Sequence, residues 1–204
     1  MVKNTALIAP ISGSIGAEVF GLDLRQIDDK SFQLLHGSLM KHLVLVVRDQ
    51  KLSPEQHLRV GRYFGSLNVH DFVAGMAEYP EIIEVIKEPE DSGYNFGGTW
   101  HSDVSFLEEP SMASLLYAKE LPDSGGDTMF ANMYLAYDTL SKGLRELLTD
   151  MRAVHSASEI YSQNSRRSDK RAGRSRSMTI VNQDKAVGEV YHPVVRTHPE
   201  TGRK

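Results

Sequence analysis

Hydrophobic residues in the N-terminal part of the chain recur first at strand-like and then at helical spacing. Residues 6–24 alternate apolar side chains with glycines, which favours short strands joined by turns. Residues 32–40 carry apolar side chains at helical spacing, and Asp28 or Ser31 is a suitable N-cap for that helix. The apolar, partly β-branched run 43–47 predicts that a buried strand follows the helix.

A second helix is predicted from the residue types at its start. Ser53 suits the N-cap, Pro54 the first helical position and Gln56 the capping-box position. We expect this helix to end near Phe64.

The rest of the chain contains several short apolar segments and one longer amphipathic segment. Residues 82–86, 113–118 and 127–131 are predicted strands, with a turn at 122–126 before the last of them. Leucines at helical spacing predict a helix over 134–151.

Composition narrows the class of protein. The chain has 204 residues, 40% of them hydrophobic, which suits one globular domain over 1–204. It has no cysteine, which excludes disulfides, thiolate metal sites and a cysteine nucleophile. The net charge of −4 predicts no general attraction to nucleic acid or to an anionic membrane. No apolar run approaches the ~20 residues of a membrane span and no signal peptide is evident, so we expect a cytoplasmic protein.

The segment 100–104, Trp-His-Ser-Asp-Val, carries the clearest candidate chemistry. On a strand, His101 and Asp103 project to the same side because side chains alternate with period two. One imidazole and one carboxylate supply two ligands of a 2-His-1-carboxylate site, which suits non-haem Fe(II). The third ligand would be a histidine from elsewhere. The alternative is a surface strand that carries both residues without a metal.

The sequence around this segment resembles that of the taurine dioxygenase family of Fe(II)- and 2-oxoglutarate-dependent oxygenases. The family pattern is W-H-[ST]-D-V-[ST]-F, then K-E-x-P, then G-G-D-T, and it recurs here in the same order. Matching segments occur along nearly the whole chain, at residues 15–24, 45–50, 64–70, 100–106, 119–122, 125–128 and 192–199.

The resemblance implies a fold, a reaction and several site residues. The fold would be mostly β with peripheral helices, a distorted jelly roll or double-stranded β-helix. The cofactor would be Fe(II), held by His101 and Asp103, with 2-oxoglutarate and O₂ as co-substrates that yield succinate and CO₂ while a substrate carbon is hydroxylated. Thr128 matches the family position whose hydroxyl contacts 2-oxoglutarate. Its alternative role is that of a β-forming residue after the tight turn at Gly125 and Gly126.

Two residues match substrate-binding positions of the family. His70 corresponds to the histidine that contacts the anionic group of the substrate, and Val104 to a residue that offers its backbone N–H to the same group. The asparagine of the taurine enzymes is replaced by Gly97 or Gly98. An expected tyrosine after His70 is also absent, since Phe72 and Val73 stand there. The partner is therefore predicted to be a small anionic organic substrate, and another sulfonate, a sulfate ester or a carboxylate are all open.

In the family, the third iron ligand is a histidine well downstream of residues 192–199, and an arginine beyond it binds 2-oxoglutarate. The chain ends at Lys204. We therefore expect the N-terminal portion of a family member, with a barrel incomplete at its C-terminus and open strand edges that favour homo-oligomers. The alternative is a non-catalytic jelly-roll binding or structural protein. A zinc hydrolase is disfavoured because no H-E-x-x-H or comparable ligand set is present.

Three further histidines and a basic segment need separate interpretations. His192 and His198 are candidates for the missing ligand, but the resemblance places both in a non-ligand hairpin with a turn over 199–202. His155 is expected to be packed or hydrogen-bonded, and Tyr94 and Asn95 to lie in a solvated loop. We expect a mobile basic loop near the active-site mouth over 162–177. The alternative is electrostatic phosphate binding by that loop.

Overall fold

The computed structural model describes residues 6–91, 96–163 and 178–204, and these fall into two compact units. Unit 1 comprises Met1–Gly65, Leu115–Met151 and Val195–Lys204. Unit 2 comprises Ser66–Ser114 and Arg152–Val194. Tyr94, Asn95 and most of the basic segment predicted over 162–177 lie outside the described residues.

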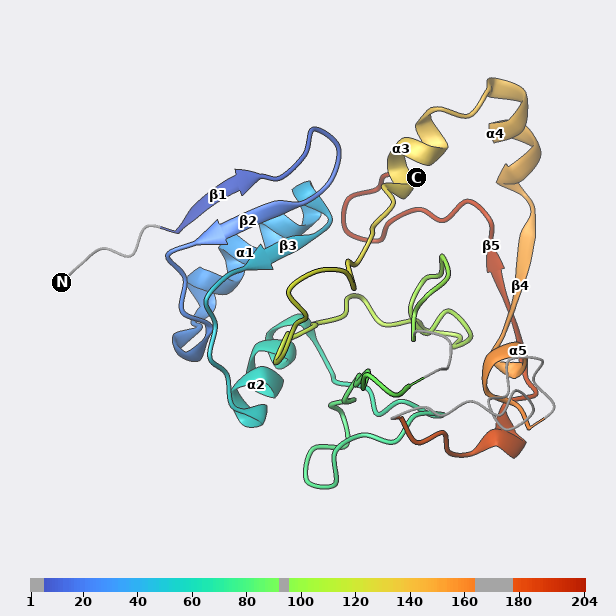
Figure 1. Cartoon of the computed structure of the whole chain (residues 1–204). Helices are drawn as coiled ribbons and strands as arrows, with labels where there is room; N and C mark the ends of the chain where they lie inside the picture. Colours follow the sequence, from blue (N-terminus) through green and yellow to red (C-terminus); the bar gives the residue numbers. More distant parts are fainter. Residues whose placement is uncertain (1–5, 92–95, 164–177) are drawn as a thin grey trace. The chain divides into compact units, whose positions relative to one another are not determined.

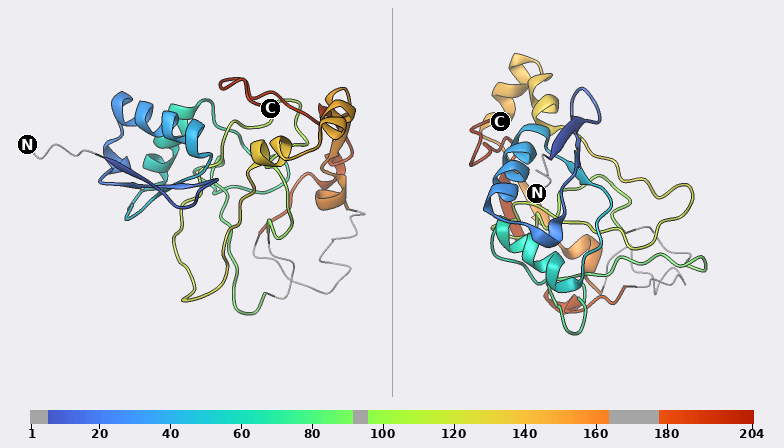
Figure 2. Two further views of the ribbon diagram at one scale, coloured as in Figure 1. Left: turned by 90° about the horizontal axis from the view of Figure 1, so that it is seen from above. Right: turned by 90° about the vertical axis from the view of Figure 1, so that its left-hand side faces the viewer.

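A three-stranded sheet with one covering helix forms the first part of unit 1 (Figure 1). Strand β1 (Leu7–Pro10) pairs antiparallel with β2 (Ala17–Phe20), which pairs in parallel with β3 (Leu45–Val47). Helix α1 (Asp29–His42) connects the two parallel strands, because such a pair needs a crossover. Figure 2 shows α1 lying along one face of this sheet.

Both predicted N-terminal helices are confirmed, together with their caps. The Asp28 carboxylate caps α1 by accepting from the Ser31 N–H at 2.8 Å. Helix α2 (Pro54–Phe64) has the full capping box, in which Ser53 and Gln56 each accept from the other's backbone N–H. A short 3₁₀ helix, η1 (Leu24–Gln26), precedes α1.

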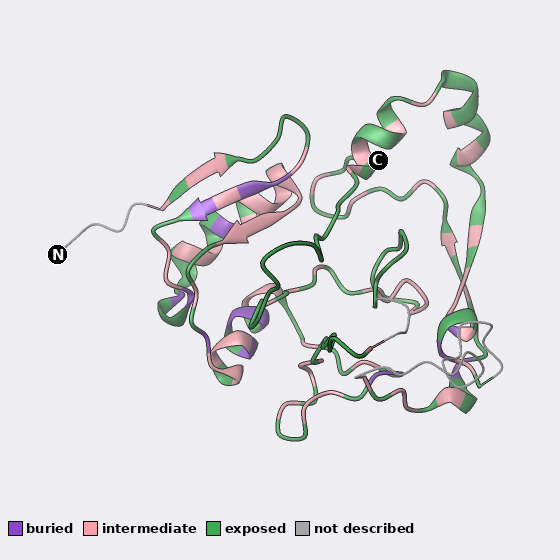
Figure 3. Ribbon diagram, viewed as in Figure 1, coloured by how far each residue is buried: buried purple, intermediate pink, exposed green. Residues whose placement is uncertain are grey.

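The core of unit 1 is built from these elements. Buried side chains from β2, η1, α1 and α2 meet in one cluster, and Figure 3 shows the buried positions of β2 and α2. Tyr117 joins the cluster from the later part of the unit, where its hydroxyl accepts from the Leu52 N–H at 3.1 Å. The buried members are Val19, Leu24, Ile27, Leu35, Leu52 and Val60.

The helix predicted over 134–151 is two helices, α3 (Met133–Asp138) and α4 (Lys142–Thr149). The prediction of one continuous helix is wrong because Ser141 accepts from the Leu144 N–H at 3.3 Å and so starts a new helix.

Unit 2 contains a two-stranded antiparallel ladder, β4 (Arg152–Ser156) with β5 (Glu189–Pro193). It also holds the short helix α5 (Ser158–Tyr161) and the 3₁₀ turn η2 (Gln183–Lys185). Its core consists of Phe72, Val73, Ala157, Tyr161 and Ala186.

The strands predicted at 82–86, 113–118 and 127–131 are wrong, since none of the three forms a ladder in the structure. A strand needs a neighbour to receive its backbone hydrogen bonds, and these segments pair with no named strand of the described chain. The described residues therefore form two small sheets and a few helices.

Candidate metal and substrate site

His101 and Asp103 lie in an irregular turn of unit 2, so the predicted strand at residues 100–104 is wrong. Their side chains nevertheless meet, with Nε2 of His101 3.1 Å from Oδ1 of Asp103. The Nδ1 atom of His101 lies 2.7 Å from the carbonyl oxygen of Thr99. A carbonyl only accepts hydrogen bonds, so Nδ1 carries a proton, and Nε2 is the ring nitrogen that faces Asp103.

The two side chains are close enough to share a proton or a metal cation. Nε2 and Oδ1 lie 3.1 Å apart, which is a hydrogen-bonded ion pair when the ring is protonated. In metal sites, a carbonyl on one ring nitrogen commonly orients a histidine whose other nitrogen binds the ion.

The second oxygen of the Asp103 carboxylate is held by a serine. The Ser114 hydroxyl donates to Oδ2 of Asp103 at 2.6 Å. Oδ1 is therefore the carboxylate oxygen that faces the imidazole ring of His101. The site is open, because the side chains of His101 and Asp103 are 46% and 56% exposed.

Gly97 packs against the open side of His101. Its φ is +70°, in the region that disfavours side chains. A Cβ at this position would lie 3.4 Å from Cε1 and 3.9 Å from Nε2 of His101. A glycine here therefore keeps the space beside Nε2 of His101 clear.

Val104 follows Asp103 in a strained backbone conformation. Its φ is +44°, which is rare for a β-branched residue. The turn that it begins is closed by the Leu107 N–H, which donates to the Val104 carbonyl at 3.0 Å. Strained residues of this kind persist only where their surroundings hold them, and they cluster at functional sites.

His70 belongs to the same unit and lies in an aromatic cluster with Phe72, Phe106 and Tyr161. Its Nδ1 accepts from the N–H groups of Phe72 and Val73, at 3.0 and 3.1 Å. Burial lowers the pKa of His70, against the opposing charges of Asp71 and Asp103. The neutral ring therefore carries its proton on Nε2, which lies 3.5 Å from the Tyr161 hydroxyl.

The predicted site residues divide between the two units. His70, His101, Asp103 and Val104 belong to unit 2, and Thr128 belongs to unit 1. Thr128 is exposed and follows the tight turn formed by Gly125 and Gly126, whose φ values are +82° and +73°.

Three histidines outside the proposed site, His155, His192 and His198, make other contacts in the structure. Nε2 of His192 lies 3.0 and 2.9 Å from the carbonyl oxygens of Ser105 and Leu107. His198 directly precedes the predicted turn over 199–202 and accepts through Nδ1 from the Glu200 N–H at 3.2 Å. His155 packs edge-on against His192, with ring centroids 5.1 Å apart. Sequence reasoning missed the contacts of Thr99, Ser114 and Tyr161, because no motif spacing links them to the ligands.

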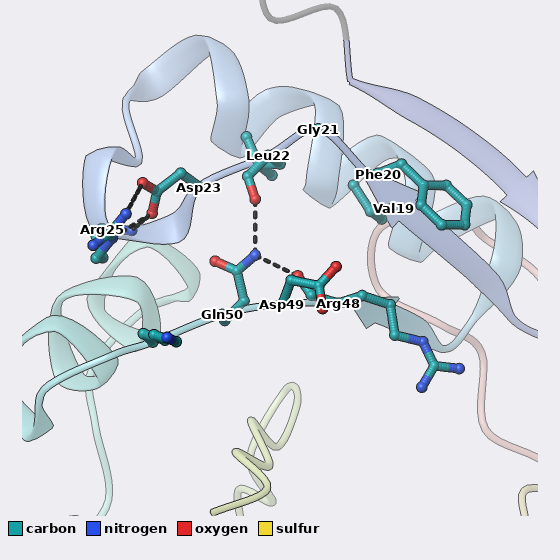
Figure 4. Close-up of a pocket in the computed structure, with 10 residues that line it drawn as sticks. Val19, Phe20, Gly21, Leu22, Asp23, Arg25, Arg48, Asp49 and Gln50 are labelled. Atoms are coloured by element: carbon teal, nitrogen blue, oxygen red, sulfur yellow. Dashed lines mark hydrogen bonds and ion pairs between the residues drawn. The ribbon is translucent and has the colours of Figure 1, made fainter.

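A cavity of about 340 Å³ in unit 1 contains none of the predicted site residues (Figure 4). Gln50 bridges its walls by donating to the carbonyls of Leu22 and Arg48. Arg25 is paired with Asp23 at 2.7 Å, and Arg48 is paired with Glu18. These pairings indicate a structural role for the cavity walls.

Two absences apply to the described part of the chain. Within residues 6–91, 96–163 and 178–204, no cluster of three histidine, aspartate or glutamate side chains could hold a metal ion. None of the helices in those ranges is long and apolar enough to span a membrane.

Comparison with known proteins finds relatives whose sequences are similar to this chain over most of its length. It is 29% identical to the "Alpha-ketoglutarate-dependent sulfonate dioxygenase" of Saccharomyces cerevisiae, over 97% of this chain and 47% of the yeast protein. It is 30% identical to the "Alpha-ketoglutarate-dependent sulfate ester dioxygenase" of Pseudomonas putida, over 97% of this chain and 64% of that protein. The chain thus spans about half the length of the yeast relative and less than two thirds of the bacterial one.

A solved structure agrees with these relatives. The crystal structure of a taurine dioxygenase from Burkholderia xenovorans superimposes with a TM-score of 0.70 at 29% identity, covering 97% of this chain and 61% of that one. The model of one protein family matches residues 7–204. The chain therefore belongs to the family described as "Taurine catabolism dioxygenase TauD, TfdA family".

Proposed function

We propose that the protein is an Fe(II)- and 2-oxoglutarate-dependent dioxygenase that hydroxylates a small anionic organic substrate. The close approach of His101 Nε2 and Asp103 Oδ1, 3.1 Å apart, carries this proposal. Family membership supports it, as do two relatives that are named as α-ketoglutarate-dependent dioxygenases of sulfonates and of sulfate esters.

The two donors suit the proposed metal. An imidazole nitrogen and a carboxylate oxygen are the ligand types of non-haem Fe(II) sites. When bound, the iron with 2-oxoglutarate would supply oxidising power from O₂ and release succinate and CO₂. The protein's part is to hold the ligands, and here Thr99 and Ser114 orient one ligand each. Thr128 is the proposed hydroxyl contact to 2-oxoglutarate.

The proposed substrate contacts are neutral hydrogen-bond donors. Nε2–H of His70 and the backbone N–H of Val104 would donate to the anionic group of the substrate. The lowered pKa of His70 supports donation by a neutral ring rather than attraction by an imidazolium. Such a site selects a group rich in acceptor oxygens, such as a sulfonate, a sulfate ester or a carboxylate.

The distorted jelly roll is also a proposal, and similarity to the Burkholderia taurine dioxygenase structure supports it. In that fold, strands β4 and β5 would be part of the barrel, as would the extended segments of unit 2.

An anaerobic titration with Fe(II) and 2-oxoglutarate tests the function. A weak visible charge-transfer band, which reports 2-oxoglutarate chelated to the metal, should develop with the protein and be lost in His101→Ala and in Asp103→Ala. The matched control is His36→Ala, since His36 also lies beside a carboxylate, 2.9 Å from Glu200 in unit 1. A band that survives either ligand substitution, or that His36→Ala removes, contradicts the proposed iron site.

A second candidate is a non-catalytic jelly-roll binding protein. It is favoured by one observation, that His101 and Asp103 are not joined by a third potential ligand among the described residues. The same titration separates the two candidates, because the binding protein would retain a small anion without developing the band.

A further inference from the structure

His192 forms a hydrogen bond that links two distant parts of unit 2. Its Nε2 lies 3.0 Å from the carbonyl oxygen of Ser105 and 2.9 Å from that of Leu107. Both partners can only accept, so Nε2 must carry the proton and share it between them. A nitrogen used in this way has no lone pair for a metal, which excludes Nε2 of His192 as an iron ligand in this conformation.

The two carbonyls belong to the turn that begins immediately after Asp103. Within that turn Val104 has a φ of +44°, and the Leu107 N–H donates to the Val104 carbonyl at 3.0 Å. A β-branched residue does not keep this conformation without external support. Among the described residues, the turn's other backbone hydrogen bond is internal, and Phe106 packs against Tyr161 of α5. His192 therefore adds a hydrogen-bonded link from this turn to a strand.

His192 is well placed to give that support. It lies on β5, where the ladder with β4 pairs it with Ala153. His155, two residues further along β4, packs edge-on against its ring at 5.1 Å and 72°. The donor is therefore fixed by a five-pair ladder and by a neighbouring ring.

We infer that His192 is a positioning residue that clamps the turn over 104–107 and thereby holds the Asp103 carboxylate and the Val104 N–H in place. It contacts no reacting atom and acts through these two residues. Its role in catalysis rests on the proposed function, whereas the clamp itself does not.

Hydrogen–deuterium exchange of the metal-free chain tests the clamp directly. His192→Leu keeps the approximate size and removes the donor, whereas His192→Gln keeps an N–H donor near the same position. We expect amide exchange over 103–108 to rise about tenfold in His192→Leu and to stay within about twofold of the wild type in His192→Gln. Equal exchange in His192→Leu and the wild type would overturn the inference.

If His192→Leu destabilised the surrounding fold, amide exchange would also become faster in β4 and β5. In that event ¹⁵N NMR of the wild-type histidines decides. Nε2 of His192 should carry a slowly exchanging proton, and a ring protonated only on Nδ1 would overturn the clamp.

Metal binding then separates the clamp from the proposed function. Fe(II) affinity should fall about tenfold in His192→Leu, with partial recovery in His192→Gln. If the wild type binds no Fe(II), the proposed function fails, and the exchange result still decides the clamp. If all three proteins bind Fe(II) equally, the positioning role is refuted.

Discussion

The Ser114 hydroxyl gives the sharpest single-atom test of the metal site. It donates to Oδ2 of Asp103 at 2.6 Å and so holds the carboxylate with Oδ1 toward His101. Ser114→Ala removes one oxygen and little volume. Losing such a partner typically costs 10–100-fold in metal affinity, roughly 1.4–2.8 kcal/mol.

For Ser114→Ala, the structure predicts a loss of metal affinity at the lower end of that range. The Asp103 side chain is 56% exposed, so water can replace the lost hydroxyl. We therefore expect Fe(II) affinity to fall about tenfold, equivalent to about 1.4 kcal/mol, in an anaerobic calorimetric titration. The folded state should change little, because neither group is buried.

Ser111→Ala is the matched control. Ser111 lies three residues earlier and accepts from the Asn68 side chain at 3.0 Å without contacting Asp103. If Ser114→Ala binds Fe(II) as tightly as Ser111→Ala does, Asp103 is not oriented by Ser114, and the account of the ligand pair given above is wrong.

Three other changes have defined outcomes. Gly97→Ala should weaken Fe(II) binding in the same titration, because the new methyl lies 3.4 Å from His101 in a backbone with φ of +70°; tight binding would show that this space is not needed. Burial lowers the folded pKa of His70, so the unfolded state binds more protons, and the free energy of unfolding should fall as pH drops below about 6.5. His70→Asn keeps an acceptor for the two N–H groups, and its free energy of unfolding, measured with denaturant, should depend less steeply on pH. A pH dependence equal to that of the wild type would refute this role of His70. Ser53→Ala should reduce the free energy of unfolding by about 1 kcal/mol through loss of the α2 cap, whereas Ser66→Ala, at an exposed serine that caps no helix, should not.

The helices that the sequence predicts correctly are those whose first residues are marked by capping side chains close by in the sequence. The capping box of Ser53 and Gln56 determines the start of α2 within a few residues, and Asp28 does the same for α1. Both helices also present their apolar faces to a core formed by nearby strands. The same rule explains the error over 134–151, where Ser141 is itself a local cap signal that the apolar periodicity concealed.

The strand errors have a different physical cause. Segments 82–86, 113–118 and 127–131 have strand-like residue types, but a strand exists only where a partner receives its hydrogen bonds. Strand β4 has such a partner in β5, more than thirty residues away. Residue types report the preference of a segment and contain no information about the position of its neighbour.

The proximity of His101 and Asp103 was predicted from the wrong geometry. Period-two alternation in a strand was the expected reason for them to meet, whereas the structure brings them together beside a turn that begins with a left-handed valine. The contacts that orient them come from Thr99, two residues before His101, and Ser114, eleven residues after Asp103. The spacing of the motif indicates the chemistry that we propose, and only the folded turn shows how the two groups are held.

His192 shows why a histidine's role cannot be read from sequence. As an isolated residue it is equally suited to bind a metal through a lone pair or to donate a proton to an acceptor. Its environment decides between these, because two carbonyls at 3.0 and 2.9 Å require a proton on Nε2 of His192, whereas a carbonyl at Nδ1 of His101 leaves Nε2 facing Oδ1 of Asp103. The position of the carbonyl oxygens around each ring thus supports the positioning role that we infer for His192 and the ligand role that we propose for His101.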